Sequence, residues 1–492
     1  MGQFVLSIHQ STTESKASLV DNKGKIIIQV SNPLKPIFLK SGWIEYKPED
    51  ILKSQFDAIK TLLKKAGPKK KQINAIGITN QPSSIVMWDK STGKPLYNAI
   101  SNKDPRGSEI CTKIADHRES VRERTGLPLS PYYSAAKIRW LLENIKSVKK
   151  FAEKGNLLCG TINTYIMWHL TKGAVYATDH TNAAQTLLFN IFTKTWDKEL
   201  LELFEIPSDI LPSILPTSNY FGDAVIDGQS IPIHANILEN QASLIGNGCL
   251  LEGEVNINYG TDGFILINTG KKIFILPGLL TTVAWSNNGS TAYLLEGRVN
   301  AAGSIFEWMK TNLGVISNKD NLDEICKQSG ERLFMLPAIS GIGAPQWNNN
   351  ITTCIYGLKS TTTREDIIRS AVEAIAFMVK DNLNVVEKDG RLQLKKIIAS
   401  GAVSKIPYLL QFQSDLLHMP LHNSTEIDSV SKGAAFLAGI NSKMWDGSSS
   451  IEKLIYTKKT SHPKLKEADV RALYERWRLT YLYSKEWSKN FS

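Results

Sequence analysis

The chain has 492 residues, of which 42% are hydrophobic, and a formal net charge of +11. This length suits two globular domains, and no stretch approaches the roughly 18 apolar residues that span a membrane. The five cysteines lie far apart without a C-x-x-C spacing. They therefore predict no zinc site or disulfide framework and favour a reducing, intracellular compartment. Residues 1–10 are typical of a strand, so we expect no signal peptide.

The positive charge lies in small lysine clusters along the chain. Such clusters are typical of solvated loops, and a basic surface facing an acidic partner is the alternative. Because no helix-turn-helix, zinc finger or aromatic-basic pattern accompanies them, nucleic-acid binding is not favoured.

Strands and helices alternate along the whole chain, which predicts an α/β fold. Two strand–turn–strand segments, residues 5–21 and 255–269, open the two halves. Their turns can present backbone N–H groups and hydroxyls to a phosphate, although ordinary β-hairpins are the alternative. Together they suggest two related domains that face one nucleotide.

The remaining pattern gives a coarse map of the elements. We expect strands at 73–79 and 397–402 and helices at 48–65, 106–123, 134–145, 303–313, 363–386, 430–437 and 467–488. Four aromatic residues of the last helix are expected to dock it, namely Tyr474, Trp477, Tyr481 and Trp487. A domain boundary near 240–250 divides the chain into 1–245 and 246–492.

Several short blocks occur together and in order, among them Gly42-Trp43-Ile44-Glu45, residues 75–81, Gly343-Ala344-Pro345 and Lys432-Gly433-Ala434-Ala435. In these blocks the chain resembles the FGGY carbohydrate kinases, with glycerol kinases as the most similar branch. The resemblance implies two ribonuclease H-like, actin-like domains with a cleft between them. Residues 1–245 would form the substrate side and residues 246–492 the nucleotide side, and the two would close on MgATP and a polyol.

The resemblance assigns the first turn to metal and phosphate. His9 stands where the family has the aspartate that orients Mg²⁺, and because Mg²⁺ prefers oxygen ligands we expect this metal position to be non-functional. Ser11 replaces a glycine and adds a Cβ near the phosphate. Thr12 and Thr13 keep their hydroxyls, and Lys16 replaces an arginine. Ser11, Thr12, Thr13 and Lys16 are the nucleotide-binding positions of this turn.

The polyol pocket departs further from the family. Its arginine–glutamate pair becomes Pro82 and Ser83, and its tryptophan becomes Asn102, whereas its tyrosine is kept as Tyr132. Ser83, Asn102 and Tyr132 are thus the implied substrate positions. Losing the charged pair would leave polyol hydroxyls unpaired, at about 1–3 kcal/mol each.

An ungapped alignment places Glu239 at the catalytic base and Asn240 at the neighbouring substrate position. A one-residue slip would put Asn240-Gln241 there instead and remove the carboxylate. Even in the first case the side chain is longer by one methylene, and a shift of about 1 Å can cost on the order of 100-fold in rate.

The second turn and the nucleoside segment supply the other predicted nucleotide positions. Thr261 is kept, Asp262 replaces a glycine, and we expect its charge to repel a triphosphate with nothing at the motif to offset it. Gly303 remains. Ser400 and Gly401 stand in the nucleoside segment, where Ser400 is expected to crowd the nucleotide.

These changes touch every functional sub-site, namely the metal position, both phosphate turns, the nucleoside segment, the substrate pocket and the base, while sparing the hydrophobic framework. They predict a catalytically inactive glycerol kinase-like protein that binds no cofactor and serves as a structural or interaction component. Its partner would present an acidic protein surface, and a homo-oligomer is a further option. The alternatives are an ATP-dependent glycerol kinase that uses MgATP, a kinase for another small polyol, or a nucleotide-binding sensor. The resemblance implies a cytoplasmic or mitochondria-associated location.

Overall fold

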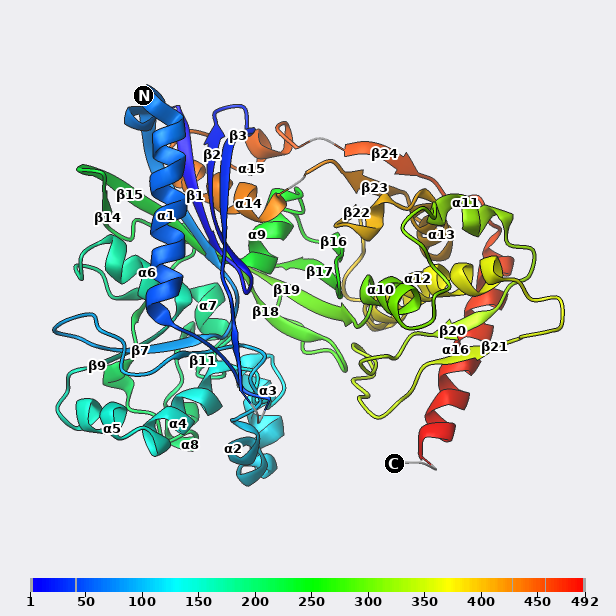
Figure 1. Ribbon diagram of the computed structural model, residues 1–492, viewed down its shortest axis with the longest axis horizontal. Helices are drawn as coiled ribbons and strands as arrows, with labels where there is room; N and C mark the ends of the chain where they lie inside the picture. The colour runs from blue at the N-terminus through cyan, green and yellow to red at the C-terminus, as the bar shows by residue number, and fades with distance from the viewer. Residues whose placement is uncertain (1–2, 40–41, 427, 456, 490–492) are drawn as a thin grey trace.

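The computed structural model describes residues 3–39, 42–426, 428–455 and 457–489. It is a mixed α/β structure in which two halves, each built on a large sheet with helices against it, lie side by side (Figure 1). Among the residues described, no helix combines the length and the apolar character that crossing a membrane requires.

The first half is built on a six-stranded sheet. In spatial order its strands are β14 (Asp223–Ile226), β15 (Gln229–Leu238), β6 (Ile73–Asn80), β1 (Phe4–Gln10), β2 (Glu14–Asp21) and β3 (Ile26–Pro33). β1 forms the predicted hairpin with β2 and runs parallel to β6, which in turn runs parallel to β15. Strands β1, β6 and β15 therefore end at one edge, at Gln10, Asn80 and Leu238.

Every residue of β1 is buried, because helices cover both faces of the sheet. On one side lies α1 (Pro48–Ala66), which starts at a proline with two acids in its first turn, as the sequence predicts. On the other side lies α14 (Ser429–Asn441), which comes from the far end of the chain.

Helix α14 crosses α9 (Glu239–Gly246) at very short range. A Cβ added at Gly433 would lie 1.8 Å from the carbonyl oxygen of Ala242, and one at Gly246 would lie 1.9 Å from that of Ser429. Because only glycine allows this approach, the crossing fixes the first turns of both helices relative to each other. Both first turns carry polar residues of the candidate site.

A smaller five-stranded sheet extends the first half. Its strands are β4 (Ile37–Phe38), β5 (Ile44–Tyr46), β8 (Ala99–Ile100), β7 (Ile85–Asp89) and β9 (Leu157–Thr161). The helix expected at 106–123 is divided into α2 (Ser108–Lys113), a 3₁₀ turn and α3 (Arg118–Thr125), whereas 134–145 is one helix, α4 (Ser134–Asn144).

The second half is built on a seven-stranded sheet. Its strands, in spatial order, are β18 (Leu280–Asn287), β19 (Ser290–Val299), β17 (Gly263–Gly270), β16 (Glu254–Tyr259), β22 (Lys396–Ser400), β23 (Leu421–Ser424) and β24 (Thr457–Ser461). β16 forms the second predicted hairpin with β17 and runs parallel to β22. The ends of β16 and β22, at Tyr259 and Ser400, therefore share an edge.

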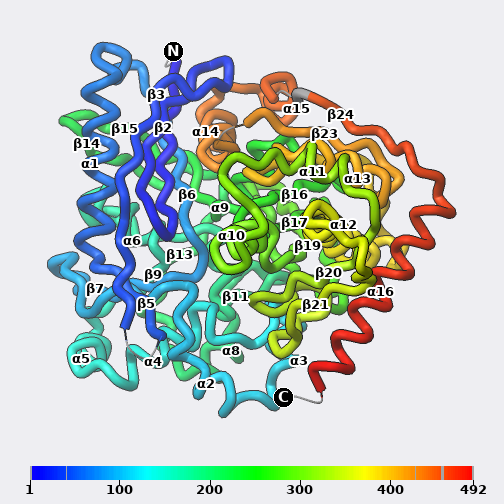
Figure 2. Tube along the Cα trace, turned by 45° about the vertical axis from the view of Figure 1, so that its right-hand side comes forward, coloured from blue at the N-terminus to red at the C-terminus, as the bar shows by residue number. Residues whose placement is uncertain are grey.

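The last helix, α16 (Glu467–Lys489), runs along the outside of the second half (Figure 2). Trp477 is 1% exposed, stacks on Phe377 and donates to Asp381, so this ring docks the helix as predicted. Trp487 is 57% exposed, and its expected docking in the core is wrong.

The remaining elements connect these layers. The helices are α5 (Lys146–Glu153), α6 (Ile162–Leu170), α7 (His180–Ala184), α8 (Lys198–Leu203), α10 (Ser304–Thr311), α11 (Leu322–Gln328), α12 (Arg364–Asp389), α13 (Pro407–Leu417) and α15 (Ser448–Glu452). The short strand pairs are β10 (Ala177–Asp179) with β13 (Ser213–Leu215), β11 (Phe189–Asn190) with β12 (Thr195–Trp196), and β20 (Phe334–Leu336) with β21 (Cys354–Tyr356).

Candidate active site

The strand edge of the first half brings His9 and Glu239 together. His9 lies near the end of β1, and Glu239 opens α9 directly after β15. The two side chains meet at 3.2 Å, between His9 Nε2 and Glu239 Oε2. His9 is buried, and its Nδ1 has no hydrogen-bond partner within the described part of the chain. The predicted base and the predicted metal position are thus in direct contact.

Lys16, which lies opposite His9 in the register of β1 and β2, reaches the second half of the chain. Its Nζ lies 2.8 Å from Glu14 and 3.8 Å from Asp428, the residue that caps the N-terminus of α14. Burial lowers the pKa of Lys16, but the hydrogen bond to Glu14 and the charge of Asp428 outweigh it and hold that pKa above its ordinary value. Asp428 also accepts a hydrogen bond from Gln29 at 2.7 Å, and no sequence pattern pointed to a role for this residue.

The first turn uses its serine internally. Ser11 Oγ donates to the carbonyl of Glu14 and accepts from the backbone N–H groups of Thr13 and Glu14. The hydroxyl therefore closes the turn and is not directed at a ligand. Thr12 accepts a hydrogen bond from Tyr46 through its carbonyl, and Thr13 is exposed at the tip.

The three predicted polyol loops also meet. Ser83 adopts φ +57° and is buried, with its hydroxyl donating to the carbonyl of Gln185. The backbone N–H of Asn102 donates to Ser84, next to Ser83. Tyr132 is 52% exposed, so its ring remains accessible.

Lys137 on α4 ties two of these loops together. The side chain is fully buried and donates to the carbonyls of Ser101, at 3.1 Å, and Tyr132, at 2.7 Å. Burial lowers its pKa to about 7. Sequence reasoning missed this residue, although its spacing from Ser134 and Leu141 places it on the buried face of the helix.

The second turn is built by close backbone contacts. Gly303 donates its N–H to the carbonyl of Thr261, and a Cβ at Gly303 would lie 2.5 Å from the carbonyl oxygen of Gly260. Gly401 has φ +92°, and a Cβ there would lie 2.6 Å from the carbonyl oxygen of Tyr259. The structure thus gathers Thr261, Gly303 and Gly401 around one turn.

Asp262 is not an uncompensated charge, which corrects the sequence expectation. Its Oδ2 lies 2.6 Å from Nη2 of Arg298. Arg298 is on β19, opposite Phe264 in the register of β17 and β19. The arginine is far from Asp262 in sequence, and only the strand pairing brings it to the turn.

Ser400 also behaves differently from the expectation. Its side chain is buried, and its hydroxyl donates to Asn256 on the neighbouring strand at 3.1 Å. The serine thus engages the interior of the sheet, which leaves Gly401 as the residue of this pair that borders the turn.

Glu296 is a buried carboxylate on the strand that carries Arg298. It lies on β19 and is 8% exposed. Burial raises its pKa to about 7, against the opposing charge of Arg298. Glu296 is thus a buried carboxyl group two residues before Arg298 on the same strand.

The described residues contain no group of three or more His, Cys, Asp or Glu side chains able to hold a metal ion by themselves. Mg²⁺ commonly keeps several waters and takes one or two protein carboxylates beside substrate phosphates. A carboxylate such as that of Glu239 fits a metal that arrives with a nucleotide, whereas His9 does not supply an oxygen ligand.

Both halves of the chain match one family of known proteins. Residues 4–246 match the N-terminal domain, and residues 255–442 the C-terminal domain, of the FGGY family of carbohydrate kinases. Glycerol kinase 2 of Thermotoga maritima is 37% identical over 99% of this chain and 100% of its own. Glycerol kinase of Francisella philomiragia is 38% identical over 99% of each chain.

The solved structures agree with this likeness. The crystal structure of Plasmodium falciparum glycerol kinase with ADP superposes with a TM-score of 0.93 at 32% identity and covers 98% of both chains. The two sheets described above thus correspond to the two actin-like, ribonuclease H-like domains of these kinases. On the matched domains and the full-length relatives, the chain belongs to the FGGY family of carbohydrate kinases.

Proposed function

We propose that this chain transfers a phosphoryl group from ATP to a hydroxyl of a small polyol, with glycerol as the first candidate. The observation that carries the proposal is the carboxylate of Glu239, which opens α9 at the strand edge with its side chain 28% exposed. The full-length relatives named glycerol kinase, and the related structure with ADP, support this reading over an inactive protein.

In this proposal each part of the site has one task. Glu239 accepts the proton of the attacking hydroxyl, which is the role of a carboxylate in phosphoryl transfer. The exposed first turn at Thr12 and Thr13, and the second turn at Thr261, donate hydrogen bonds to the phosphates. Arg298 neutralises Asp262, so that the second turn does not repel the phosphates. Mg²⁺ bound with the nucleotide would neutralise phosphate charge.

The polyol would lie among the loops of Ser83, Asn102 and Tyr132. The hydroxyl of Ser83 is already used by Gln185, so it does not replace the charged pair of the family. A pocket with few charged donors fits a small polyol held by neutral hydrogen bonds and the accessible ring of Tyr132. Lys137 would set the spacing of this pocket through the carbonyls that it holds.

A second candidate is an inactive member that acts as an interaction component. The contact between His9 and Glu239 favours it, because an imidazole occupies the position of the metal-orienting carboxylate and engages the base. Its partner would present an acidic surface to a chain of net charge +11. The five free cysteines suit a reducing compartment for either candidate.

An ADP-release assay with MgATP and a panel of small polyols separates the two candidates. We expect polyol-dependent ADP release, which Glu239→Gln lowers by about 100- to 10,000-fold because the base is lost. The matched control is Glu109→Gln, an exposed glutamate on α2, which should leave the rate unchanged. A protein that unfolds cooperatively but releases no ADP with any polyol would contradict the proposal and favour the interaction role.

A further inference from the structure

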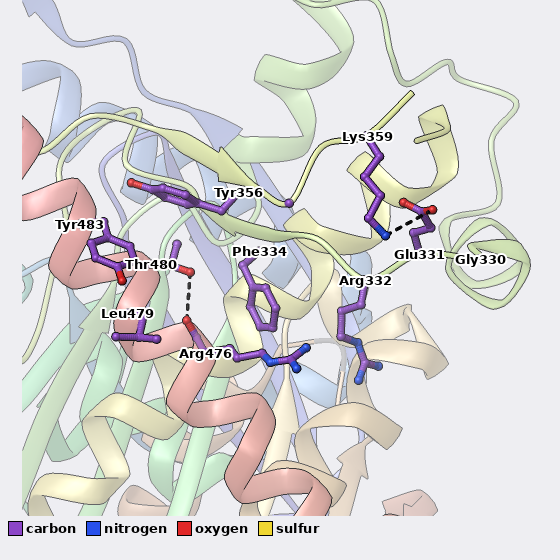
Figure 3. Close-up of a pocket in the computed structure, with 11 residues that line it drawn as sticks. Gly330, Glu331, Arg332, Phe334, Tyr356, Lys359, Arg476, Leu479, Thr480 and Tyr483 are labelled. Carbon is purple, nitrogen blue, oxygen red and sulfur yellow. Dashed lines mark hydrogen bonds and ion pairs between the residues drawn. The ribbon is translucent and has the colours of Figure 1, made fainter. Parts of the chain in front are cut away.

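A groove of about 570 Å³ opens on the outer side of the second half, between α16 and the β20–β21 hairpin. Its walls come from the start of β20, the end of β21 and one face of α16 (Figure 3). Pockets for small organic ligands typically have volumes of roughly 300–1,000 Å³. The size therefore fits a small molecule, and the groove is separate from the two turns of the candidate active site.

Positive charge exceeds negative charge in this groove. Lys359 faces Glu331 at 3.7 Å, so these two charges balance. Arg332 faces the buried Glu373 at 3.0 Å, but the same carboxylate also serves Arg369 at 2.9 Å. One carboxylate between two guanidinium groups leaves one positive charge in excess. The Nε of Arg332 is also buried without a hydrogen-bond partner within the described residues.

Arg476 supplies a second uncompensated charge. It forms no ion pair with any residue in the described ranges, and its neighbours one helical turn away are Ala472, Leu473, Leu479 and Thr480, none of them acidic. Figure 3 shows its guanidinium extending past Phe334 toward Arg332. The two arginines thus approach one region of the groove from opposite walls.

The remaining wall is aromatic. The rings of Tyr356 and Tyr483 lie 6.2 Å apart at an interplanar angle of 46°, and Tyr356 is held by a hydrogen bond to Ser484. Tyr483 is 57% exposed and Leu479 is 46% exposed, so the helix presents apolar area beside the charge. An aromatic surface next to two arginines matches a ligand with a planar ring and an anionic group.

We propose that this groove binds a small organic anion in which a phosphate or carboxylate is joined to an aromatic ring. The anion contacts Arg476 and Arg332, and the ring packs against Phe334, Tyr356 and Tyr483. The site does not depend on phosphoryl transfer, and it remains available whether or not the chain is an active kinase.

Calorimetric titration of the full chain with phenyl phosphate tests the proposal. Inorganic phosphate and phenol, which each carry half of the ligand, should bind more weakly than phenyl phosphate. Arg476→Ala should weaken phenyl phosphate binding about tenfold, because a charge-assisted hydrogen bond is lost, and Arg476→Lys should weaken it less. Arg471→Ala removes an exposed arginine of the same helix that pairs with Glu467, and it should leave the affinity unchanged.

Hydrogen exchange with bound phenyl phosphate locates the site, since phosphate groups could also bind at the two turns. We expect protection in residues 330–336, 354–359 and 476–483. Protection confined to residues 9–14 or 260–262 would overturn the proposal. So would equal affinity of the unmodified chain and Arg476→Ala, or the absence of saturable binding at millimolar phenyl phosphate.

Discussion

The two turns that open the two halves have the same strand–turn–strand form but obtain their surroundings in different ways. Near the first turn, His9 contacts Glu239 and Lys16 contacts Asp428. Both carboxylates come from the N-terminal ends of helices that are distant in sequence. At the second turn, Asp262 is paired with Arg298 from the adjoining strands of the same sheet.

The two turns therefore depend on different parts of the structure. The hairpin turn of β1 and β2 depends on how α9 and α14 are placed, because Glu239 opens α9 and Asp428 caps the N-terminus of α14. The second turn depends on local pairing and on glycines such as Gly303, which lie directly against its backbone. A change far from the first turn should therefore disturb it, whereas the second turn should respond mainly to its own neighbours.

The crossing of α9 and α14 gives the largest expected effect. In Gly433→Ala the new Cβ would lie 1.8 Å from the carbonyl oxygen of Ala242, so the helices must separate. We expect the free energy of unfolding to fall by about 3 kcal/mol, because backbone atoms on both sides resist the shift. Urea unfolding measures the change.

The control for this variant is Gly289→Ala, where the nearest atom is 3.9 Å away and φ is not left-handed. It should cause no loss of stability. A midpoint for Gly433→Ala equal to that of the unmodified chain would show that the crossing can relax, and that the first turn does not depend on it.

Glu296, the buried carboxylate on β19, gives a pH-dependent effect of intermediate size. Burial raises its pKa to about 7 in the folded protein, while the unfolded chain releases the proton near 4.5. Between these values the folded state binds more protons, so stability falls as pH rises, by up to about 1.4 kcal/mol per pH unit. Glu296→Gln should remove this contribution from the slope, measured by unfolding across that range.

An exposed glutamate provides the comparison for this slope. Glu307 on α10 is largely exposed, and Glu307→Gln should leave the pH dependence as it is. Identical slopes for Glu296→Gln and the unmodified chain would mean that Glu296 is already ionised at low pH in the folded protein.

The Asp262–Arg298 pair gives the smallest effect on stability, up to about 1 kcal/mol, since both side chains are partly exposed. Substitution of either partner should also change the affinity for ATP, in opposite directions for the two residues. Arg298→Ala leaves a negative charge beside the phosphates and should weaken ATP binding severalfold, while Asp262→Asn frees the arginine and should strengthen it. Titration with ATP measures both, and changes of the same sign would contradict local compensation.

Local sequence patterns were enough to predict the α/β class, both hairpins and most of the long helices. These features follow from short-range patterns, such as the proline and acids that start α1 and the turn residues between β16 and β17. The family motifs were also enough to identify the fold, because they occur in the same order as in the family along both matched domains.

The surroundings of the altered residues depend on contacts between segments that are distant in sequence. From the sequence, the charge of Asp262 had no partner, but strand pairing brings Arg298 to it. Ser400 was expected to crowd the nucleotide, but its hydroxyl donates a hydrogen bond to Asn256. Charge pairing acts through space between residues that are distant in sequence, and side-chain direction depends on the neighbouring strand. A motif that is examined one residue at a time shows neither the charge pairing nor the side-chain direction. The expectation of an inactive site therefore counted Asp262 and Ser400 as losses, although the structure gives each of them a partner.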